Sequence, residues 1–497
     1  MLKMTRTEVR VLTKWAALAV MAFAVTPGHA AEPIGSLPDT ALGRLGAELV
    51  RRLNTDSPEQ IRAWAEQAGA AMPADARAEF VKAIVTADKD TGGVNLVSAR
   101  PGRVAAGSVV MTLRAHRAPR FATAVLVPAT GAPDRLGAVF FSTIPDPAIY
   151  RDWPKGRVSK AELQSRVHAA VQALVRTAGF SGCVTVLRGG QTVIDECAGI
   201  AERNFSVPVD RETRFRIGSM DKMFTATAIA QLVEAGKLKW DSTLAELVPE
   251  YPDKDAARSI TVWQLLHHQA GLGDIFVPEL FQNREKFVNP ADYLDLISRQ
   301  QKVGKPGEQW SYSNAGFVLL GRIVENASGE GYFDYIQRHI FAPAGMTATG
   351  YDSREDVVPH LAVGYLQDDV FGLEPAKANW ETLPFKASPA GGGYSTNSDL
   401  LRFATALRSG RLIRKDTIER MFKDGVPVMA GHTYNAGFDE GIFSGRHVRG
   451  HNGGAPGMNA DLALVWETGD AVAVTSNTDQ PAAQDLGDHI GELLAAQ

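Results

Sequence analysis

The segment Arg216-Ile217-Gly218-Ser219-Met220-Asp221-Lys222 decides how the rest of the chain is interpreted. Ser219 begins a stretch whose apolar residues recur at helical spacing, and Lys222, three residues later, falls on the same helical face. A serine hydroxyl is a weak nucleophile without a base, and a buried lysine loses part of its preference for the charged state. The pattern predicts a nucleophile, Ser219, beside a proton acceptor, Lys222. Taken alone, a serine at this place also fits a helix N-cap.

A second candidate element is Tyr312-Ser313-Asn314, which precedes a predicted helix over residues 315–327. The Tyr312 phenol can act as a general base if a neighbouring ammonium favours the phenolate. The Asn314 amide can position Lys222 and a substrate carbonyl. The alternative is a surface tyrosine next to an asparagine that caps a helix.

The third element, His451-Asn452-Gly453-Gly454, lies at the end of a predicted strand. Its glycines allow a substrate backbone to approach closely. The N–H groups of Gly454 and Ser219 can together form an oxyanion hole.

A zinc site at the same strand is an alternative, because His447 and His451 are four residues apart. Gly445 and Gly450 favour strand and loop over the helix that such spacing requires, and no third ligand is evident. We therefore expect no metal and no cofactor.

In this order the three elements resemble those of the serine β-lactamase and penicillin-binding protein family, in its branch of class C β-lactamases, DD-peptidases and esterases. Three further segments are similar to the family: 265–272 (LLHHQAGL), 391–399 (GGGYSTNSD) and 449–457 (RGHNGGAPG). The resemblance covers about residue 167 to the C-terminus. It implies an antiparallel sheet with a helical subdomain. It also implies an acylated Ser219, a proton-handling pair of Lys222 and Tyr312, a positioning amide at Asn314, and a His451 that lines the pocket. Gly453 and Gly454 are expected beside them as the oxyanion and substrate-positioning residues.

The sequence departs from this family at two places. His451 stands where class C β-lactamases carry lysine, and a histidine is mostly neutral near pH 7. This departure favours a neutral ester or an amide over an antibiotic substrate. Gln269-Ala270 replaces Thr-Ser, and the preceding His267 and His268 are expected to be core histidines with satisfied partners. No Gly-x-Ser-x-Gly elbow is found, which disfavours an α/β-hydrolase.

The chain of 497 residues is long enough for two domains. Residues 1–30 have a basic leader, an apolar run over 15–25 and small residues before Ala31, which predicts a secretory signal cleaved after Ala30. The apolar run is shorter than the roughly 20 residues that span a bilayer. We expect a secreted or periplasmic protein without a stable membrane span. A net charge of -4 gives no reason to expect nucleic acid as a partner.

Residues 32–145 are predicted to form a small α+β domain. Helical periodicity extends to about residue 88, and short alternating strands follow at 94–96, 108–113, 121–127 and 136–142. This order resembles cystatin-like or nuclear-transport-factor-like domains, with helices on one face of a curved sheet. Such a domain serves for binding, docking or dimer contact, or is an inert spacer. Residues 146–158 are the predicted linker.

Residues 159–497 are predicted as the catalytic domain, again of mixed α/β (α+β) class. A helix at 159–178 and a hairpin come first, helices follow to about residue 430, and strands are expected at 434–443, 446–451, 459–466 and 471–477. A helix at 482–495 ends the chain. This order predicts an antiparallel sheet built from both ends of the domain, with a helical insert between them.

Cys183 and Cys197 flank the predicted hairpin, whose strands at 184–188 and 192–196 surround a three-residue loop that includes Gly189-Gly190. In an oxidising compartment the two cysteines can form a disulfide, and two free thiols are the alternative.

The sequence therefore predicts an exported serine hydrolase that acts through a Ser219 acyl-enzyme on a small ester or peptide-like amide. An esterase or a D-amino-acid-type peptidase, carboxypeptidases included, ranks ahead of a true β-lactamase. A non-catalytic penicillin-binding-like binding or sensor protein is the competing hypothesis.

Overall fold

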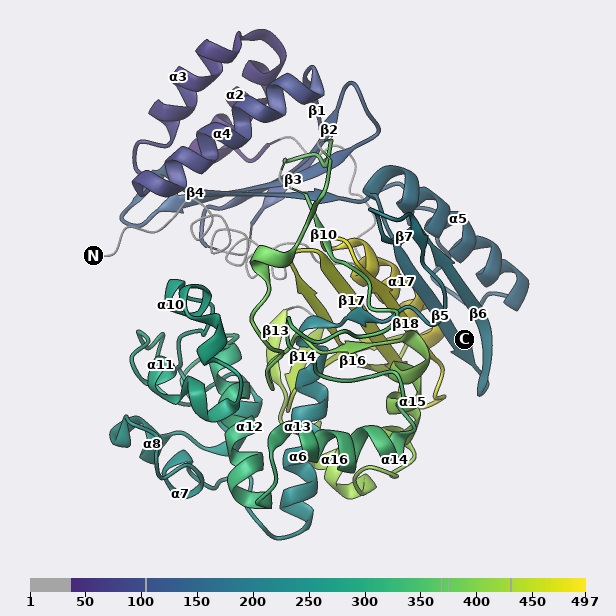
Figure 1. The fold of residues 1–497 in the computed structure, drawn as a ribbon. Helices are drawn as coiled ribbons and strands as arrows, with labels where there is room; N and C mark the ends of the chain where they lie inside the picture. The colour runs from purple at the N-terminus through teal and green to yellow at the C-terminus, as the bar shows by residue number, and fades with distance from the viewer. Residues whose placement is uncertain (1–36, 103–104, 368, 374, 430) are drawn as a thin grey trace.

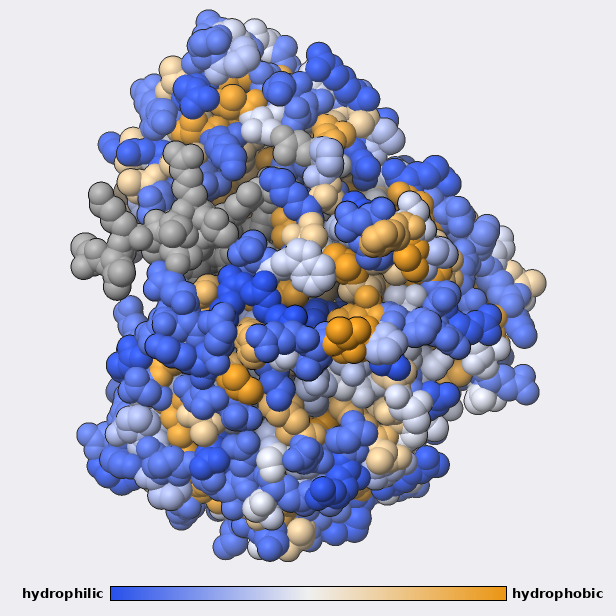
Figure 2. Space-filling view, in the orientation of Figure 1, coloured by the Kyte–Doolittle hydropathy of each residue, from blue (hydrophilic) through white to orange (hydrophobic). Residues whose placement is uncertain are grey.

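The computed structural model describes residues 37–102, 105–367, 369–373, 375–429 and 431–497. The predicted signal at 1–30 lies outside the described residues. The chain forms a small N-terminal domain and a larger domain that corresponds to the predicted catalytic domain (Figure 1). Hydrophilic residues cover most of the face shown in Figure 2, and apolar residues lie there in small separate groups. Within the described ranges, no helix is both long and apolar enough to cross a membrane.

The N-terminal domain has three helices on one face of a four-stranded antiparallel sheet (Figure 1). The elements are α2 (Ala41–Thr55), α3 (Pro58–Ala68), α4 (Ala74–Thr91), β1 (Val94–Pro101), β2 (Val109–Ala115), β3 (Phe121–Ala129) and β4 (Ala132–Ile144). The strands are neighbours in chain order. Alternate residues such as Met111 and Leu113 point to the helices and are almost fully buried. The predicted order of helices followed by a meander is thus found.

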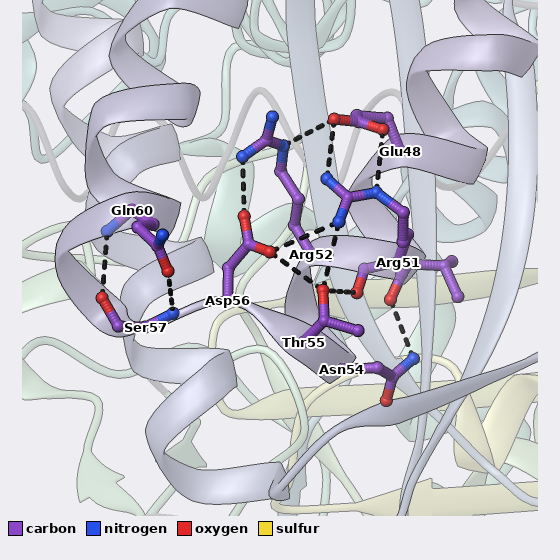
Figure 3. A network of polar contacts seen from close by, with 9 residues as sticks. Glu48, Arg51, Arg52, Asn54, Thr55, Asp56, Ser57 and Gln60 are labelled. Atoms are coloured by element: carbon purple, nitrogen blue, oxygen red, sulfur yellow. Dashed lines mark hydrogen bonds and ion pairs between the residues drawn. The ribbon is translucent and has the colours of Figure 1, made fainter.

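The break between α2 and α3 has a local cause. Ser57 caps α3 in a reciprocal pair with Gln60, and Pro58 occupies the first turn. Just before the break, Arg52 donates to Glu48 and Asp56 along α2 (Figure 3). Partly exposed ion pairs of this kind contribute little stability, so the cap rather than the charges defines the helix boundary.

The catalytic domain is built on an eight-stranded antiparallel sheet of order β13-β14-β15-β16-β17-β18-β5-β6. Its strands are β5 (Gly182–Arg188), β6 (Gln191–Ala198), β13 (Val426–Met429), β14 (His432–Asn435), β15 (Phe438–Phe443), β16 (Arg446–Ala455), β17 (Met458–Val465) and β18 (Ala471–Ser476). Pairing of β18 with β5 joins the two ends of the domain, as predicted.

Helices cover both faces of this sheet. α5 (Lys160–Ala178) and α17 (Ala482–Ala495) pack against one face through residues such as Val465 and Val474. The insert packs against the other face through Leu462 and Leu464. The helices of the insert and the segment after it are α6 (Asp221–Glu234), α7 (Leu244–Leu247), α8 (Lys254–Ser259), α9 (Val262–Leu266), α10 (Pro278–Gln282), α11 (Leu294–Ser298), α12 (Asn314–Ser328), α13 (Tyr332–Ile336), α14 (Ala342–Ala344), α15 (Asn397–Arg408) and α16 (Lys415–Met421).

Short elements connect these helices to the sheet. They are β7 (Ile200–Glu202), β8 (Val207–Pro208), β9 (Phe215–Arg216), β10 (Tyr365–Leu366), β11 (Lys377–Ala378), β12 (Tyr394–Ser395), η1 (Gly218–Met220), η2 (Arg284–Lys286), η3 (Pro290–Tyr293), η4 (Gln337–Phe341) and η5 (Trp380–Thr382).

Two predicted details are wrong. The strand expected over 434–443 is divided into β14 and β15, because Ala436 and Gly437 both adopt positive φ, at 41° and 87°. The hairpin of β5 and β6 has a two-residue loop instead of three, since Arg188 pairs with Gln191.

The segment between β10 and β11 connects the two domains. Its Val370 and Phe371 are buried in the core of the N-terminal domain, with Phe371 only 1% exposed. Thr143 Oγ1 of β4 donates to the Val370 carbonyl at 3.1 Å. The N-terminal domain therefore holds a loop that belongs to the catalytic domain.

Cys183 and Cys197 are directly opposite each other in the hairpin and form a disulfide, with a Cα–Cα distance of 4.1 Å. The bond closes a short loop at the edge of the large sheet, so its main effect is to restrict the unfolded chain.

Replacing both cysteines by serine is expected to lower the free energy of unfolding of the catalytic domain by about 3 kcal/mol, because a closed loop of this length restricts the unfolded state by that amount. Guanidinium denaturation followed by circular dichroism measures the change. The reduced wild-type protein should unfold at the same midpoint as the double variant. Equal midpoints for oxidised wild type and variant would show that the bond contributes nothing.

Candidate active site

Ser219 lies in the η1 turn that leads directly into α6. The preceding Gly218 has φ of 53°, and a Cβ there would lie 2.8 Å from the Gly454 backbone nitrogen. A side chain at position 218 is therefore excluded by backbone conformation and by contact with β16. This close approach brings Ser219 to the end of the sheet where Gly453 and Gly454 lie.

Ser219 and Lys222 belong to one hydrogen-bond network. Lys222 Nζ lies 3.1 Å from Ser219 Oγ, 2.8 Å from Asn314 Oδ1 and 2.5 Å from the Ala390 carbonyl oxygen. Tyr312 Oη lies 2.7 Å from Ser219 Oγ. The structure thus brings together four of the predicted site residues, which come from η1, α6, α12 and the segment before α12.

Burial controls the charge of Lys222. The side chain is fully buried, and desolvation lowers the pKa of its ammonium to about 7, against the opposing charges of Asp274, Asp221 and Asp439. A neutral amine keeps two N–H donors and one lone pair. Two of its three neighbours, Asn314 Oδ1 and the Ala390 carbonyl, can only accept, so the lone pair is directed at Ser219 Oγ. This arrangement suits Lys222 as the base that removes the serine proton.

The protonation state of Tyr312 differs from the phenolate that a general base requires. Burial raises the pKa of its phenol, so the neutral hydroxyl is favoured over phenolate, and it donates to Ser219 Oγ. Lys222 Nζ lies 4.8 Å from the Tyr312 ring centroid, which is a contact with the ring face and not with the phenol oxygen. Tyr312 is therefore placed to supply or relay a proton and not to remove one from resting Ser219.

Asp274 is a site residue that the sequence analysis missed. Its carboxylate accepts hydrogen bonds from the Asn314 backbone N–H at 2.9 Å and from Asn314 Nδ2 at 3.0 Å. Because Nδ2 must face this carboxylate, Oδ1 faces Lys222. The position of Asp274 directly after the segment 265–272, at the start of the next loop, was the available signal.

His451 is buried, with its Nε2 3.2 Å from the Tyr434 hydroxyl. Burial and the charge of Lys222 lower the pKa of His451 to about 3, so the imidazole is neutral. Its predicted place in the pocket lining is not found, because the Tyr434 ring and the sheet enclose it.

His267 and His268 both lie in the core. His267 contacts the Trp263 carbonyl and the Ala436 N–H through its two ring nitrogens, as expected for a structural histidine. His268 Nδ1 accepts from the Ser313 N–H, and its ring packs 4.3 Å from the Tyr312 ring. Its Nε2 has no hydrogen-bond partner among the described residues, so the expectation of satisfied partners is wrong for this atom.

A cavity opens at Ser219, with about 560 Å³ of empty space that includes open solvent at its mouth. Its polar lining includes Ser219, Asn314 and Gly454, and its apolar lining comes mainly from the wall 383–387, Phe276 and Met458. Both proposed oxyanion-hole residues therefore border one cavity. Gly453 does not line it; a Cβ there would lie 1.8 Å from the Ile217 carbonyl oxygen, so this glycine permits the turn of Ser219 to pack on β16. In the described part of the chain, no group of three or more His, Cys, Asp or Glu is placed to hold a metal ion.

The antiparallel sheet, its helical insert and the Ser219–Lys222–Tyr312 site define the fold of a serine-hydrolase family. Residues 167–497 match the family described as Beta-lactamase, and the chain belongs to that family.

Similar proteins include penicillin-binding proteins and enzymes that act on D-amino acid compounds. A putative penicillin-binding protein PbpX of Bacillus subtilis is 32% identical over 52% of this chain and 62% of its own length. A D-aminopeptidase of Cereibacter sphaeroides is 28% identical over 61% of this chain and 58% of its own length. The crystal structure of a D-amino acid amidase from Ochrobactrum anthropi is 25% identical, covers 68% of this chain and 97% of that one, and has a TM-score of 0.57. The chain thus spans less than two thirds of the length of PbpX and of the D-aminopeptidase.

Substituting Asp274→Asn is expected to lower the rate of Ser219 acylation about tenfold to a hundredfold, because a charge-assisted hydrogen bond that orients Asn314 is lost. The lost negative charge also lowers the pKa of Lys222, so the rise of acylation rate with pH moves to lower pH. Stopped-flow acylation measured between pH 5 and 9 tests both effects. Asp295→Asn, which removes an exposed acid beside Arg299, is the matched control. An unchanged midpoint in Asp274→Asn would contradict this role.

Proposed function

We propose that this protein is an exported serine hydrolase that forms an acyl-enzyme at Ser219 and cleaves an ester or a peptide-like amide. The observation that carries the proposal is the buried Lys222, whose Nζ is held by two acceptors and lies 3.1 Å from Ser219 Oγ. A nucleophilic serine needs such a base, and a pKa of about 7 suits proton transfer near neutral pH.

The reaction follows from these contacts. Lys222 takes the Ser219 proton as Oγ attacks the substrate carbonyl, and the backbone N–H groups of Ser219 and Gly454 bind the resulting oxyanion. The tetrahedral intermediate collapses and the proton passes through Tyr312 to the leaving group. Water then attacks the acyl-enzyme with the same residues acting in reverse order, which releases the acid and free Ser219.

The substrate class rests on two supports. His451 is neutral and buried, so it provides no fixed cation for a substrate carboxylate of the kind that a lysine in this place supplies. The named activities among similar proteins include a D-aminopeptidase and a D-amino acid amidase, which favour an amide. An ester or peptide-like amide therefore ranks ahead of a β-lactam.

Export is supported by the N-terminal sequence pattern and by the disulfide between Cys183 and Cys197. A non-catalytic binding protein remains the competing class. It would need neither the amine geometry of Lys222 nor the hydroxyl contact of Tyr312, and both are present.

A fluorophosphonate probe is expected to label the wild-type protein at Ser219 and to leave Ser219→Ala unlabelled. Lys222→Met should be labelled at least about a hundredfold more slowly, because the base is lost. Gel fluorescence with peptide mass spectrometry measures both results, and Ser409→Ala serves as a control at a distant helix end. Equal labelling of wild type and Ser219→Ala would refute the proposal. Turnover of a p-nitrophenyl ester, a D-amino-acid amide and a chromogenic cephalosporin then ranks the substrates.

A further inference from the structure

Four charged side chains line the cavity at Ser219: Arg216, Asp352, Arg354 and Lys386. Arg216 is already paired, because its two terminal nitrogens lie 3.0 and 2.8 Å from the two Asp352 carboxylate oxygens. This pair is largely buried and leaves no charge for a ligand. Arg354 and Lys386 are thus the remaining charges of the lining, and both are positive.

Neither cation forms an ion pair within the described ranges, but hydrogen bonds from Ser353 and the charge of Lys386 lower the pKa of Asp356, so this acid partly balances Lys386. The Arg354 side chain is exposed, and in the described ranges its guanidinium makes no hydrogen bond or ion pair. Lys386 Nζ lies 4.0 Å from the Phe333 ring centroid and forms no ion pair within the same ranges. Asp356, an acid of the same segment, accepts from the Ser353 backbone N–H at 2.7 Å and does not line the cavity.

A third cation lies behind the apolar wall of the cavity. Arg284 is 9% exposed, and its guanidinium donates to the carbonyl oxygens of Phe281 and Glu381 instead of to a carboxylate. Burial and the nearby charge of Arg354 lower the pKa of Arg284, against the opposing charges of Glu381 and Glu285. Like charges collected at a partly enclosed site raise the local concentration of anions.

The position of Tyr312 indicates which part of a substrate this cavity accepts. The leaving group must lie next to the residue that returns the proton, and Tyr312, whose hydroxyl contacts Ser219 Oγ, is outside the cavity lining. The cavity extends instead past Asn314 and the wall 383–387. It is therefore the site for the acyl part of the substrate.

From this geometry we infer that the preferred substrates carry a carboxylate on the acyl side, bound at the cavity mouth by Arg354 with Lys386 beside it, and joined to the scissile carbonyl by an apolar chain. The planar guanidinium of Arg354 matches a carboxylate through two parallel hydrogen bonds. Phe276, Leu383 and Met458 supply the apolar contact for the connecting chain. This inference rests on the proposed function, since it names the substrate class of the same site.

Three aryl esters test the inference. For each enzyme variant, kcat/KM for the second and for the third ester is divided by kcat/KM for the first. The first has a neutral acyl chain, the second is the half-ester of glutaric acid with an anionic acyl chain, and the third has a neutral acyl chain and a carboxylate on the phenol. The wild type is expected to prefer the second ester over the first by about tenfold, the effect of one charge-assisted hydrogen bond. Added salt should reduce this preference because Arg354 is exposed.

In Arg354→Gln the preference for the anionic acyl chain should fall to less than about twofold, and in Lys386→Gln it should fall partly. Arg411→Gln, at an exposed arginine outside the cavity, should keep the wild-type ratio. The kcat/KM of the third ester relative to the first should be the same in the wild type and in Arg354→Gln. A wild type without preference, or an Arg354→Gln variant that keeps it, would overturn the inference.

A binding measurement separates this inference from the proposed function. Calorimetry with Ser219→Ala and the monoanilide of glutaric acid needs no catalysis, and binding should weaken about tenfold when Arg354→Gln is added. If no ester is hydrolysed and this binding persists, the proposed function fails and the acyl-side carboxylate site stands. If esters are hydrolysed and the monoanilide binds equally with and without Arg354, only the inference fails.

Discussion

The burial of one lysine is the constraint on which the site depends. Lys222 has no exposed surface, and its amine has three neighbours: Ser219 Oγ, Asn314 Oδ1 and the Ala390 carbonyl oxygen. A buried ammonium is costly unless it is paired, and here the acids lie at a distance while neutral acceptors make the direct contacts. The result is an amine that changes charge near neutral pH and that is aimed at the nucleophile.

The rest of the fold keeps that lysine dry and its partners in place. Joining β5 to β18 places both ends of the domain in one sheet, and the insert supplies α6 and α12, which carry Lys222 and Asn314. The wall of the cavity follows β11 in the chain, and Leu383 of this wall packs against Ala455 and Met458. The segment before β11 is anchored by Phe371 in the core of the N-terminal domain, so that domain packs against the part of the chain that leads to the cavity wall.

Motifs with a chemical reason for their spacing could be predicted from sequence, and contacts made by loops could not. Ser219 and Lys222 share a helix turn, so their proximity follows from local geometry. The charge state of Tyr312 could not be predicted from sequence, because it depends on burial among residues far apart in the chain. Asp274 was missed for a similar reason, since its contact with Asn314 is made across forty residues. The division of β14 from β15 was not predicted, because alanine seldom adopts the positive φ that Ala436 has here.

The most direct test of this account is the pKa of Lys222 itself. Carbon NMR of protein whose lysines carry carbon-13 at Cε follows the titration of each lysine side chain. The Lys222 signal is the one that is lost in Lys222→Met. The account predicts one lysine that titrates near pH 7, well below the value of about 10.4 for exposed lysines. A Lys222 signal that stays in the ammonium form above pH 9 would contradict the claim that this residue is the base.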